Sequence, residues 1–185
     1  MELKTERLIL REWRKKDVKD IIEGLNNLEV TKWLAVVPYP YTKKDAKEWI
    51  NHCSKEAKKG KKRSFYEFAI ELKSEKKAIG GIGLFHVDKF QETAEAGIWL
   101  NTKYHKKGYG PEALDALLKF AFNKLKLRRV YAGFFKGNPS SFKVQRKFGF
   151  KIEGMKRAGR RSKADGKIKD EYITGLLKKE WKRPR

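Results

Sequence analysis

The chain has 185 residues, and 46 lysines and arginines against 23 aspartates and glutamates give it a formal charge of +23. Its single cysteine, Cys53, excludes an internal disulfide framework or thiolate metal site, and the three histidines lack metal-ligand spacing, so we expect no metal. There is no signal-peptide pattern, and no apolar run approaches the roughly 18 residues of a membrane span. We therefore expect one soluble, cytoplasmic domain spanning residues 1–185, without membrane contact.

The positive charge favours polyanionic partners. RNA or the ribosome, an anionic cofactor, and a lysine-rich thermophile-like surface without any partner all explain it, and composition does not separate them. The charge argues mildly against polycationic acceptors such as polyamines, which this surface would repel at long range.

The first half of the chain predicts strands and two helices. Residues 7–13 alternate apolar and polar side chains as a strand does, and Asp17 is expected to cap a helix. Residues 26–41, rich in aromatic residues and proline, form either a groove-lining loop or a merely packed one. Thr42 and Asp45 form a capping-box pattern for a second helix that ends near Gly60. Residues 65–72 and 78–87 predict two strands.

The second half predicts a strand at 94–100, a helix from Pro111 to about Leu125, and a strand at 129–135. Asn138 is expected to cap a short helix that ends at Gly149. Strands at 150–154 and 171–177 close the chain, with a basic loop at 156–169 between them. This order implies a mixed α/β sheet with helices on both faces and a ligand cleft near the glycines that precede Pro111.

That glycine loop, residues 105–110, has the features of a phosphate site. Gly108 and Gly110 allow close approach of the backbone, and Pro111 suits the first helical position. First-turn amides and the helix dipole would then meet a pyrophosphate, with Lys106 and Lys107 adding charge. A solvated turn explains the local pattern equally well. It is neither a Walker loop nor a three-glycine dinucleotide fingerprint.

The order of these pieces resembles the GNAT superfamily of acyl-CoA N-acyltransferases, specifically its ribosomal-protein N-terminal acetyltransferase branch. The match spans nearly the whole chain, including the tail. The motifs that carry it are Thr5-Glu6-Arg7-Leu8-Ile9-Leu10-Arg11, Ala94-Glu95-Ala96-Gly97-Ile98-Trp99-Leu100, Gly108-Tyr109-Gly110-Pro111-Glu112-Ala113-Leu114, Asn138-Pro139-Ser140-Ser141, Lys147-Phe148-Gly149-Phe150 and Glu153-Gly154. The resemblance implies an α/β (α+β) fold with a mostly antiparallel sheet of about seven strands.

It also implies acetyl-CoA as cofactor. The pyrophosphate motif falls on residues 105–110, where His105 replaces the usual Gln or Arg, and the expected loop contacts are His105, Lys106, Lys107, Gly108, Tyr109, Gly110 and Pro111. The backbone of Ile98, Trp99 and Leu100 would hold the pantetheine arm and the acetyl carbonyl. Asn138 and Ser141 would contact the cofactor near its sulfur.

Aminolysis of a thioester needs no covalent enzyme intermediate, so Cys53 is assigned to core packing rather than nucleophilic catalysis. Glu95 is the candidate base, although a cross-strand pair with a lysine explains it at least as well; Glu92 is a lesser candidate. Many superfamily members have a tyrosine that acts as the general acid near the position where this chain has Gln145. Ser141 could instead hydrogen-bond the sulfur or orient a water, or simply belong to the helix start.

The basic residues of the predicted loop are Lys156, Arg157, Arg160, Arg161 and Lys163, where the resemblance suggests acceptor binding. They could hold an acidic acceptor or RNA, or stay solvated. Three functions are therefore compared: an acetyltransferase for protein α-amino groups, one for small amines such as amino acids, aminoglycosides or polyamines, and an RNA- or ribosome-binding module. A homodimer is kept as a further partner state.

Overall fold

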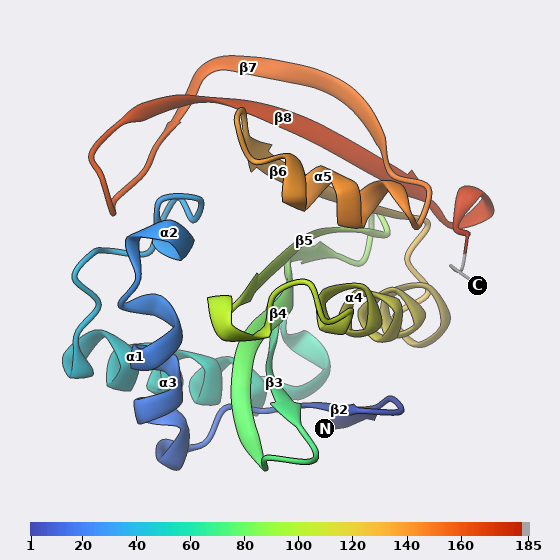
Figure 1. Ribbon diagram of the computed structural model, residues 1–185. Coiled ribbons are helices and arrows are strands. Elements are labelled where there is room, and N and C mark those ends of the chain that lie inside the picture. The colour runs from blue at the N-terminus through green and yellow to red at the C-terminus, as the bar shows by residue number, and fades with distance from the viewer. Residues whose placement is uncertain (183–185) are drawn as a thin grey trace.

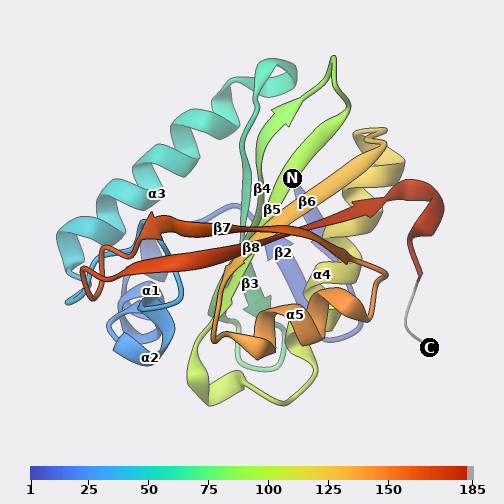
Figure 2. The same ribbon diagram turned by 90° about the horizontal axis from the view of Figure 1, so that it is seen from above.

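The computed structural model describes residues 1–182 (Figure 1, Figure 2). Within this part of the chain, one sheet has the strand order β1-β2-β3-β4-β5-β6-β8-β7. Neighbouring strands are antiparallel except β5 and β6, which are parallel. The strands are β1 Glu2–Lys4, β2 Leu8–Arg11, β3 Tyr66–Leu72, β4 Lys77–Asp88, β5 Thr93–Leu100, β6 Arg129–Phe135, β7 Lys151–Arg161 and β8 Ile168–Leu177. The predicted mixed, mostly antiparallel sheet is confirmed, with β1 as an unexpected extra strand.

Helices cover both faces of the sheet, as predicted. Figure 2 shows α1 and α3 on one side and α4 and α5 on the other. The helices are α1 Val18–Leu25, α2 Leu28–Thr31, α3 Lys43–Lys58, α4 Tyr109–Lys119 and α5 Pro139–Arg146, with a π-helical turn η4 at Phe120–Lys124 and 3₁₀ turns η1 Lys15–Asp17, η2 Gly60–Lys62, η3 Thr102–Tyr104 and η5 Lys178–Glu180. No helix within residues 1–182 is long and apolar enough to cross a membrane.

Two apolar clusters, one on each face, hold the helices to the sheet. On one face, Leu114 and Leu117 of α4 pack into a cluster that includes Phe68 and Ile82 from the central strands. On the other face, Ile21 and Leu25 of α1 and Ile50 and Cys53 of α3 form a second cluster. Cys53 is buried there, as expected for core packing. Strand β3 lies between the clusters and is buried along its whole length.

Of the two helix caps predicted in the N-terminal part of the chain, the structure contains one. The capping box is confirmed, because Asp45 donates its N–H to Thr42 Oγ1 at 3.3 Å and Thr42 donates its N–H to Asp45 Oδ2 at 2.8 Å. The prediction that Asp17 caps α1 was wrong. Its carboxylate instead accepts hydrogen bonds from Arg11 at 2.7 and 2.9 Å. Arg11 is buried, and an enclosed guanidinium loses far more without carboxylate partners than a helix loses without a cap.

The basic loop predicted at 156–169 was also wrong, because most of it is β-structure. β7 and β8 form a long hairpin that arches over the molecule in Figure 1, with its turn between Arg161 and Ile168. Every residue of β7 is exposed, so no apolar alternation marks it in the sequence. The strand also contains a register shift between Lys156 and Arg160, where Ala158 has a φ of +48°.

Helix α4 begins at Tyr109, so Pro111 takes its third position rather than the predicted first. Proline is harmless there, since early helical N–H groups lack an intrahelical partner in any case. The predicted apolar stripe to Leu125 is confirmed as α4 followed by the π-helical turn, whose Phe120 and Phe122 are buried.

Candidate active site

Strands β5 and β6 diverge at one end. Their parallel ladder pairs residues only as far as Glu95 and Tyr131, whereas β5 continues to Leu100 and β6 to Phe135. Parallel neighbours that diverge leave backbone groups without ladder partners, and buried backbone groups need partners. The end of β5 is therefore an open strand edge.

The direction of each backbone group along this edge follows from the antiparallel ladder with β4. Asn101 donates its N–H to the Ile79 carbonyl of β4, so Trp99, two residues earlier, also faces β4. Ile98 faces the opposite way, toward the side that β6 has left. Its N–H and C=O can bind a ligand that lies along the edge as an added strand would.

Leu100 also faces that side, but its carbonyl is already engaged. His105 Nε2 lies 2.9 Å from this oxygen and donates to it, because a carbonyl can only accept. The His105 side chain is thus directed back onto β5. Of the three residues expected to hold the pantetheine arm, Ile98 alone has both backbone groups directed to the open side and free of these contacts.

The glycine loop presents the start of α4 to solvent. Gly108 precedes the helix with a φ of +84° and is exposed. The first intrahelical bond runs from the Glu112 N–H to the Gly108 carbonyl at 3.2 Å. The N–H groups of Tyr109 and Gly110 come before this bond, so they have no intrahelical acceptor. Lys106 and Lys107 are exposed beside them. Amides, dipole and lysines together suit a diphosphate.

A bridge between the N-terminal segment and α4 holds this loop in place. Arg7 Nε donates to Glu112 Oε2 at 2.7 Å, and Arg7 Nη1 donates to the Lys107 carbonyl at 3.0 Å. Thr5 Oγ1 donates to the other oxygen of Glu112 at 2.6 Å. Burial opposes ionisation of this carboxyl, but the bonds with Thr5 and Arg7 prevail and lower the pKa of Glu112. The Arg7 guanidinium also lies over the Tyr109 ring.

On α5, Ser141 ends a buried hydrogen-bond chain. The Thr174 hydroxyl of β8 lies 2.6 Å from Gln145 Oε1 and 3.0 Å from the Ala132 carbonyl, and its single proton serves one of these two acceptors at a time. Gln145 Nε2 donates to Ser141 Oγ at 3.1 Å. Thr174 and Gln145 are buried. Because Ser141 Oγ accepts from the amide, its own proton is free to point elsewhere. Asn138 caps the helix as predicted, accepting the Ser141 N–H at 3.4 Å.

Glu95 lies at the fork where β5 and β6 separate. Its side chain is 22% exposed, and His86 Nε2 lies 3.9 Å from its carboxylate. Among the described residues no lysine forms the cross-strand ion pair that was the alternative explanation for Glu95. It lies opposite Tyr131 on β6, and burial together with this carboxylate raises the pKa of Tyr131. Glu92 is exposed in the preceding turn, where its carbonyl accepts the Arg128 N–H.

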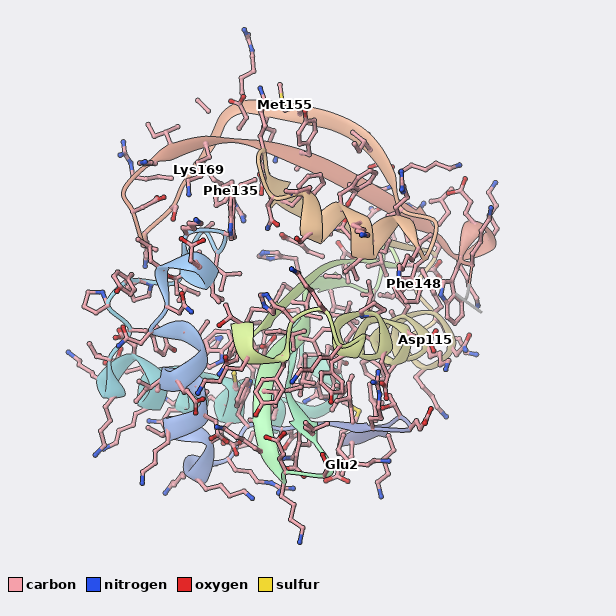
Figure 3. The ribbon with its side chains drawn as sticks, in the orientation of Figure 1. Glu2, Asp115, Phe135, Phe148, Met155 and Lys169 are labelled. Atoms are coloured by element: carbon pink, nitrogen blue, oxygen red, sulfur yellow. The ribbon has the colours of Figure 1, made fainter. Side chains whose placement is uncertain are left out.

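The β7–β8 hairpin covers the side of the sheet on which Glu95 lies. The Lys163 N–H donates to the Ala35 carbonyl at 3.0 Å, which ties the hairpin turn to the loop after α2. Lys169 Nζ donates to the Lys32 carbonyl at 2.6 Å and lies 5.2 Å from the Phe135 ring centre. Figure 3 labels Lys169 and Phe135 beneath the hairpin.

The other basic side chains expected to bind the acceptor belong to β7. Arg160 lies 3.7 Å from Glu171, and Arg161 donates to the Gly166 carbonyl at 2.7 Å. Lys156 and Arg157 are exposed. Two of these four arginines and lysines are therefore already engaged within the hairpin.

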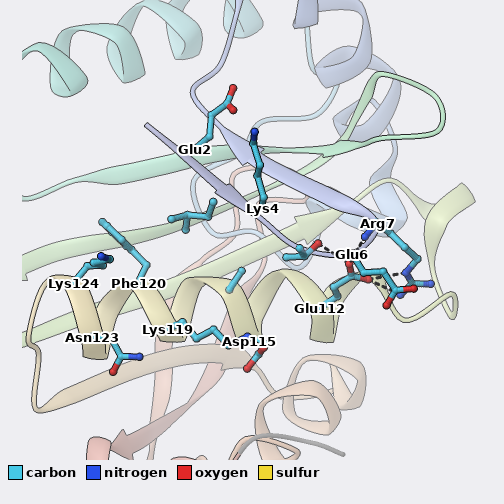
Figure 4. A pocket seen from close by; sticks show the side chains of 13 residues that line it. Glu2, Lys4, Glu6, Arg7, Glu112, Asp115, Lys119, Phe120, Asn123 and Lys124 are labelled. Atoms are coloured by element: carbon cyan, nitrogen blue, oxygen red, sulfur yellow. Dashed lines mark hydrogen bonds and ion pairs between the residues drawn. The ribbon is translucent and has the colours of Figure 1, made fainter.

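A surface groove of about 970 Å³ lies elsewhere, between the β1 edge and the outer side of α4 (Figure 4). Arg7 and Glu112 line one end of this groove, but Gly108 and Ile98 do not line it. Its lining residues carry both positive and negative side chains. We place the chemistry at the open β5 edge, because the end of the β5–β6 ladder and the start of α4 lie on this side of the described structure. No cluster of His, Cys, Asp and Glu within residues 1–182 could hold a metal ion.

Three features were not predicted from the sequence: the Arg7 bridge and the chain from Thr174 to Ser141 in this site, and the buried carboxyl of Glu67 on β3. The first two join residues far apart in sequence, so no local pattern marks them. Glu67 had a signal. It shares one face of the predicted strand with Glu71. Among the described residues Glu71 has an arginine partner, Arg11, at 2.6 Å, and Glu67 has none.

Comparisons with known proteins agree with this geometry. The family model for the acetyltransferase (GNAT) domain matches residues 7–151. The N-acetyltransferase YnaD of Bacillus subtilis (strain 168) is 30% identical over 181 residues, covering 98% of this chain and 99% of YnaD. A GNAT-family acetyltransferase structure from Bacillus anthracis has a TM-score of 0.81 at 28% identity, covering 97% of this chain and 100% of the other.

Spermidine N-acetyltransferase from Vibrio cholerae, solved with CoA and spermine, shares the fold with a TM-score of 0.80 at 21% identity, covering 95% and 98% of the two chains. An open strand edge can pair with an extended ligand, and a helix start can hold a diphosphate. The chain therefore belongs to the GNAT acetyltransferase family and is an acetyl-CoA-dependent N-acetyltransferase.

Proposed function

We propose that this enzyme acetylates the N-terminal α-amino group of a protein, with ribosomal proteins as the first class to test. The observation that carries the transfer reaction is the pair of free backbone groups on Ile98, beside a helix start that presents unpaired N–H groups at Tyr109 and Gly110. This arrangement holds a thioester and its diphosphate through the backbone. It therefore tolerates the unusual His105 in the loop motif.

Each group in the site has a distinct task in this proposal. Bound acetyl-CoA supplies an activated acetyl thioester. The loop amides and Lys106 and Lys107 hold the diphosphate, and Ile98 orients the carbonyl for attack. Ser141, kept as a donor by Gln145, stabilises charge on the departing sulfur. Glu95, whose carboxylate lies 3.9 Å from His86 Nε2, can take a proton from the amine directly or through one water.

The choice of a protein α-amino group rests on charge and on relatives. A chain with a formal charge of +23 repels polycations at long range. YdaF of Bacillus subtilis (strain 168), named as a candidate ribosomal N-acetyltransferase, is 34% identical over 102 residues, 55% of each chain. A small amine is the competing acceptor, since spermidine N(1)-acetyltransferase of Escherichia coli is 23% identical over 145 residues. A cytoplasmic setting, a homodimer and contact with RNA stay predictions.

Thiol release from acetyl-CoA tests the proposal. Peptides that copy ribosomal N-termini are compared with the same peptides blocked at the N-terminus but carrying a lysine, and with spermidine. We expect turnover with the free α-amino group and not with the blocked peptides. Turnover with spermidine alone would move the enzyme to the small-amine class. Salt-sensitive RNA binding without turnover would favour a binding module.

A further inference from the structure

The turn between β4 and β5 carries an aromatic ring that acetyl transfer does not use. Phe90 is 90% exposed, more than any other large apolar side chain in the described part of the chain. Its turn is well held, because Asp88 Oδ1 accepts the N–H groups of Phe90 and Gln91 at 2.9 and 2.8 Å. On the other side, Arg128 Nε donates to the Gln91 carbonyl at 3.0 Å. The turn therefore presents its ring to solvent from a fixed backbone.

Basic side chains lie on both sides of this turn. The Val87 N–H donates to the Ser64 carbonyl at 2.9 Å, which places the segment after α3 against the end of β4. Lys62 and Lys89 line a hollow of about 580 Å³ at this junction. Arg128, which directly precedes β6, flanks the turn from the other side. Figure 2 shows the end of α3 and the β4–β5 turn at the same end of the molecule.

The acidic side chains near this turn are fewer, and most of them are engaged. Glu56 pairs with Lys59 at 2.6 Å at the end of α3, where Lys58 is also exposed. The Asp88 carboxylate is turned toward the N–H groups of the turn. Glu92 is exposed in the turn and would oppose a bound anion. Basic side chains outnumber these carboxylates, so this end of the molecule attracts anions.

An isolated ring among basic side chains fits a nucleic acid better than a protein. The anchors of protein interfaces are surrounded by further contacts that exclude water. The neighbours of Phe90 in the turn are Lys89, Gln91 and Glu92, which are polar and exposed. The other large exposed apolar side chains, apart from Met1, belong to α2, the loop after it and the β7–β8 hairpin. Proteins that bind single strands combine exposed aromatic rings, on which bases stack, with cations that hold phosphates.

The β7–β8 hairpin is also strongly basic, but it lacks this combination. Its large exposed apolar side chains are Ile152, Met155 and Ile168, which are all aliphatic. Such a surface attracts a polyanion through charge and offers no ring on which a base can stack. The Phe90 turn is therefore the better candidate for binding a nucleic acid.

We propose that the Phe90 turn binds single-stranded RNA. A base stacks on the Phe90 ring, Lys62 and Lys89 hold phosphates over the hollow, and Arg128 holds a phosphate on the other side of the turn. The RNA is single-stranded because the bases of a duplex stack on one another and hide their faces. Such a strand combines the negative charge that a chain with a formal charge of +23 attracts with the flat bases that the ring can hold.

This surface is separate from the open β5 edge. The turn precedes Thr93, the first residue of β5, and Ile98 lies roughly 17 Å farther along the extended strand. RNA on the turn therefore leaves the backbone groups of Ile98 open to acetyl-CoA. The inference goes beyond the proposed function and does not depend on turnover.

Fluorescence anisotropy with a labelled single-stranded RNA of about 12 nucleotides, measured between about 50 and 200 mM NaCl, tests this surface. For Phe90→Ala we expect about tenfold weaker binding with an unchanged salt dependence, because stacking releases no counterions. Phe90→Trp keeps an aromatic face and should bind as tightly as the wild-type protein.

Replacing the lysines changes the salt dependence instead. In the double variant Lys62→Ala with Lys89→Ala, the slope of log K against log salt should become shallower by about 1.4, since each phosphate contact of a single strand contributes about 0.7. The control, Lys43→Ala with Lys47→Ala, removes the same charge from exposed positions at the start of α3, roughly 20 Å from its other end. Its slope should match the wild-type slope, and its affinity should stay within about twofold.

Wild-type affinity in Phe90→Ala would overturn the proposal, and so would the absence of RNA binding at about 50 mM NaCl. If the control weakens binding as much as the Lys62 and Lys89 pair, or if duplex RNA or a polyglutamate peptide binds as tightly as the single strand, diffuse charge explains the binding and the proposal fails. Tighter binding of single-stranded DNA would also contradict it. The Phe90 ring is almost fully exposed, so Phe90→Ala should fold and release thiol from acetyl-CoA at the wild-type rate. Absence of turnover in both proteins would refute the proposed function and leave the RNA result unaffected.

Discussion

Replacing Glu67 by glutamine has a consequence for stability that needs no assay of activity. A carboxyl whose pKa rises from 4.5 in the unfolded chain to about 8 in the folded one binds its proton more tightly when folded. Its contribution to stability is fully present below pH 4.5 and is lost as the pH rises through 8. The loss amounts to about 3 kcal/mol at pH 7 and about 5 kcal/mol above pH 8. Glutamine has nearly the same shape and cannot ionise.

Urea denaturation of both proteins at pH 5 and at pH 8.5 measures the effect as a difference between matched curves, so other titrating groups cancel. At pH 5 the two stabilities should lie within about 1 kcal/mol. At pH 8.5 the variant should be more stable by several kcal/mol. If the difference is independent of pH, Glu67 titrates normally, and the argument from burial and the missing cation is refuted.

Three further changes probe the cofactor side. Gly108→Val should weaken acetyl-CoA binding at least tenfold, because a β-branched residue at a φ of +84° costs roughly 1–2 kcal/mol and crowds the loop; Gly166→Val, equally left-handed at +68° in the hairpin turn, should leave calorimetric affinity unchanged. Gln145→Leu should lower kcat about tenfold at constant acetyl-CoA KM, since Ser141 loses its orienting donor; an unchanged kcat would remove this chain from the mechanism. Arg7→Ala should raise the acetyl-CoA KM several-fold with little change in kcat, and Arg7→Lys should restore it only in part, because lysine cannot make the forked contact.

Features with a local cause were predictable from the sequence. The capping box at Thr42, the cap at Asn138 and the apolar stripe of α4 each depend on neighbouring residues, and each is confirmed. Positions whose conformation depends on distant partners were not. Asp17 was predicted as a helix cap, but its carboxylate accepts two hydrogen bonds from the buried Arg11 instead. The start of β7 was predicted as a strand, but its part from residue 156 onward looked like a loop, because a strand exposed on both faces carries no alternating pattern.

The candidate site also contains features with a local cause and features that depend on distant residues. The glycine loop and the strand beside it could be proposed as a site from residue types and spacing, since both depend on one contiguous segment. The backbone directions at Ile98, Trp99 and Leu100 depend on pairing with β4 and on His105, so the sequence could not rank them. The role of Gln145 also needed Thr174, which follows it by a full strand. Gln145, which stands where many superfamily members have a tyrosine, donates a hydrogen bond to Ser141 Oγ.

A structure of the protein crystallised with coenzyme A tests the central claim most directly. We expect diphosphate oxygens within about 3 Å of the N–H groups at Tyr109 and Gly110, and a pantetheine amide paired with the backbone of Ile98. A diphosphate bound in the groove between β1 and α4, or an Ile98 edge covered by another part of the chain, would contradict the account.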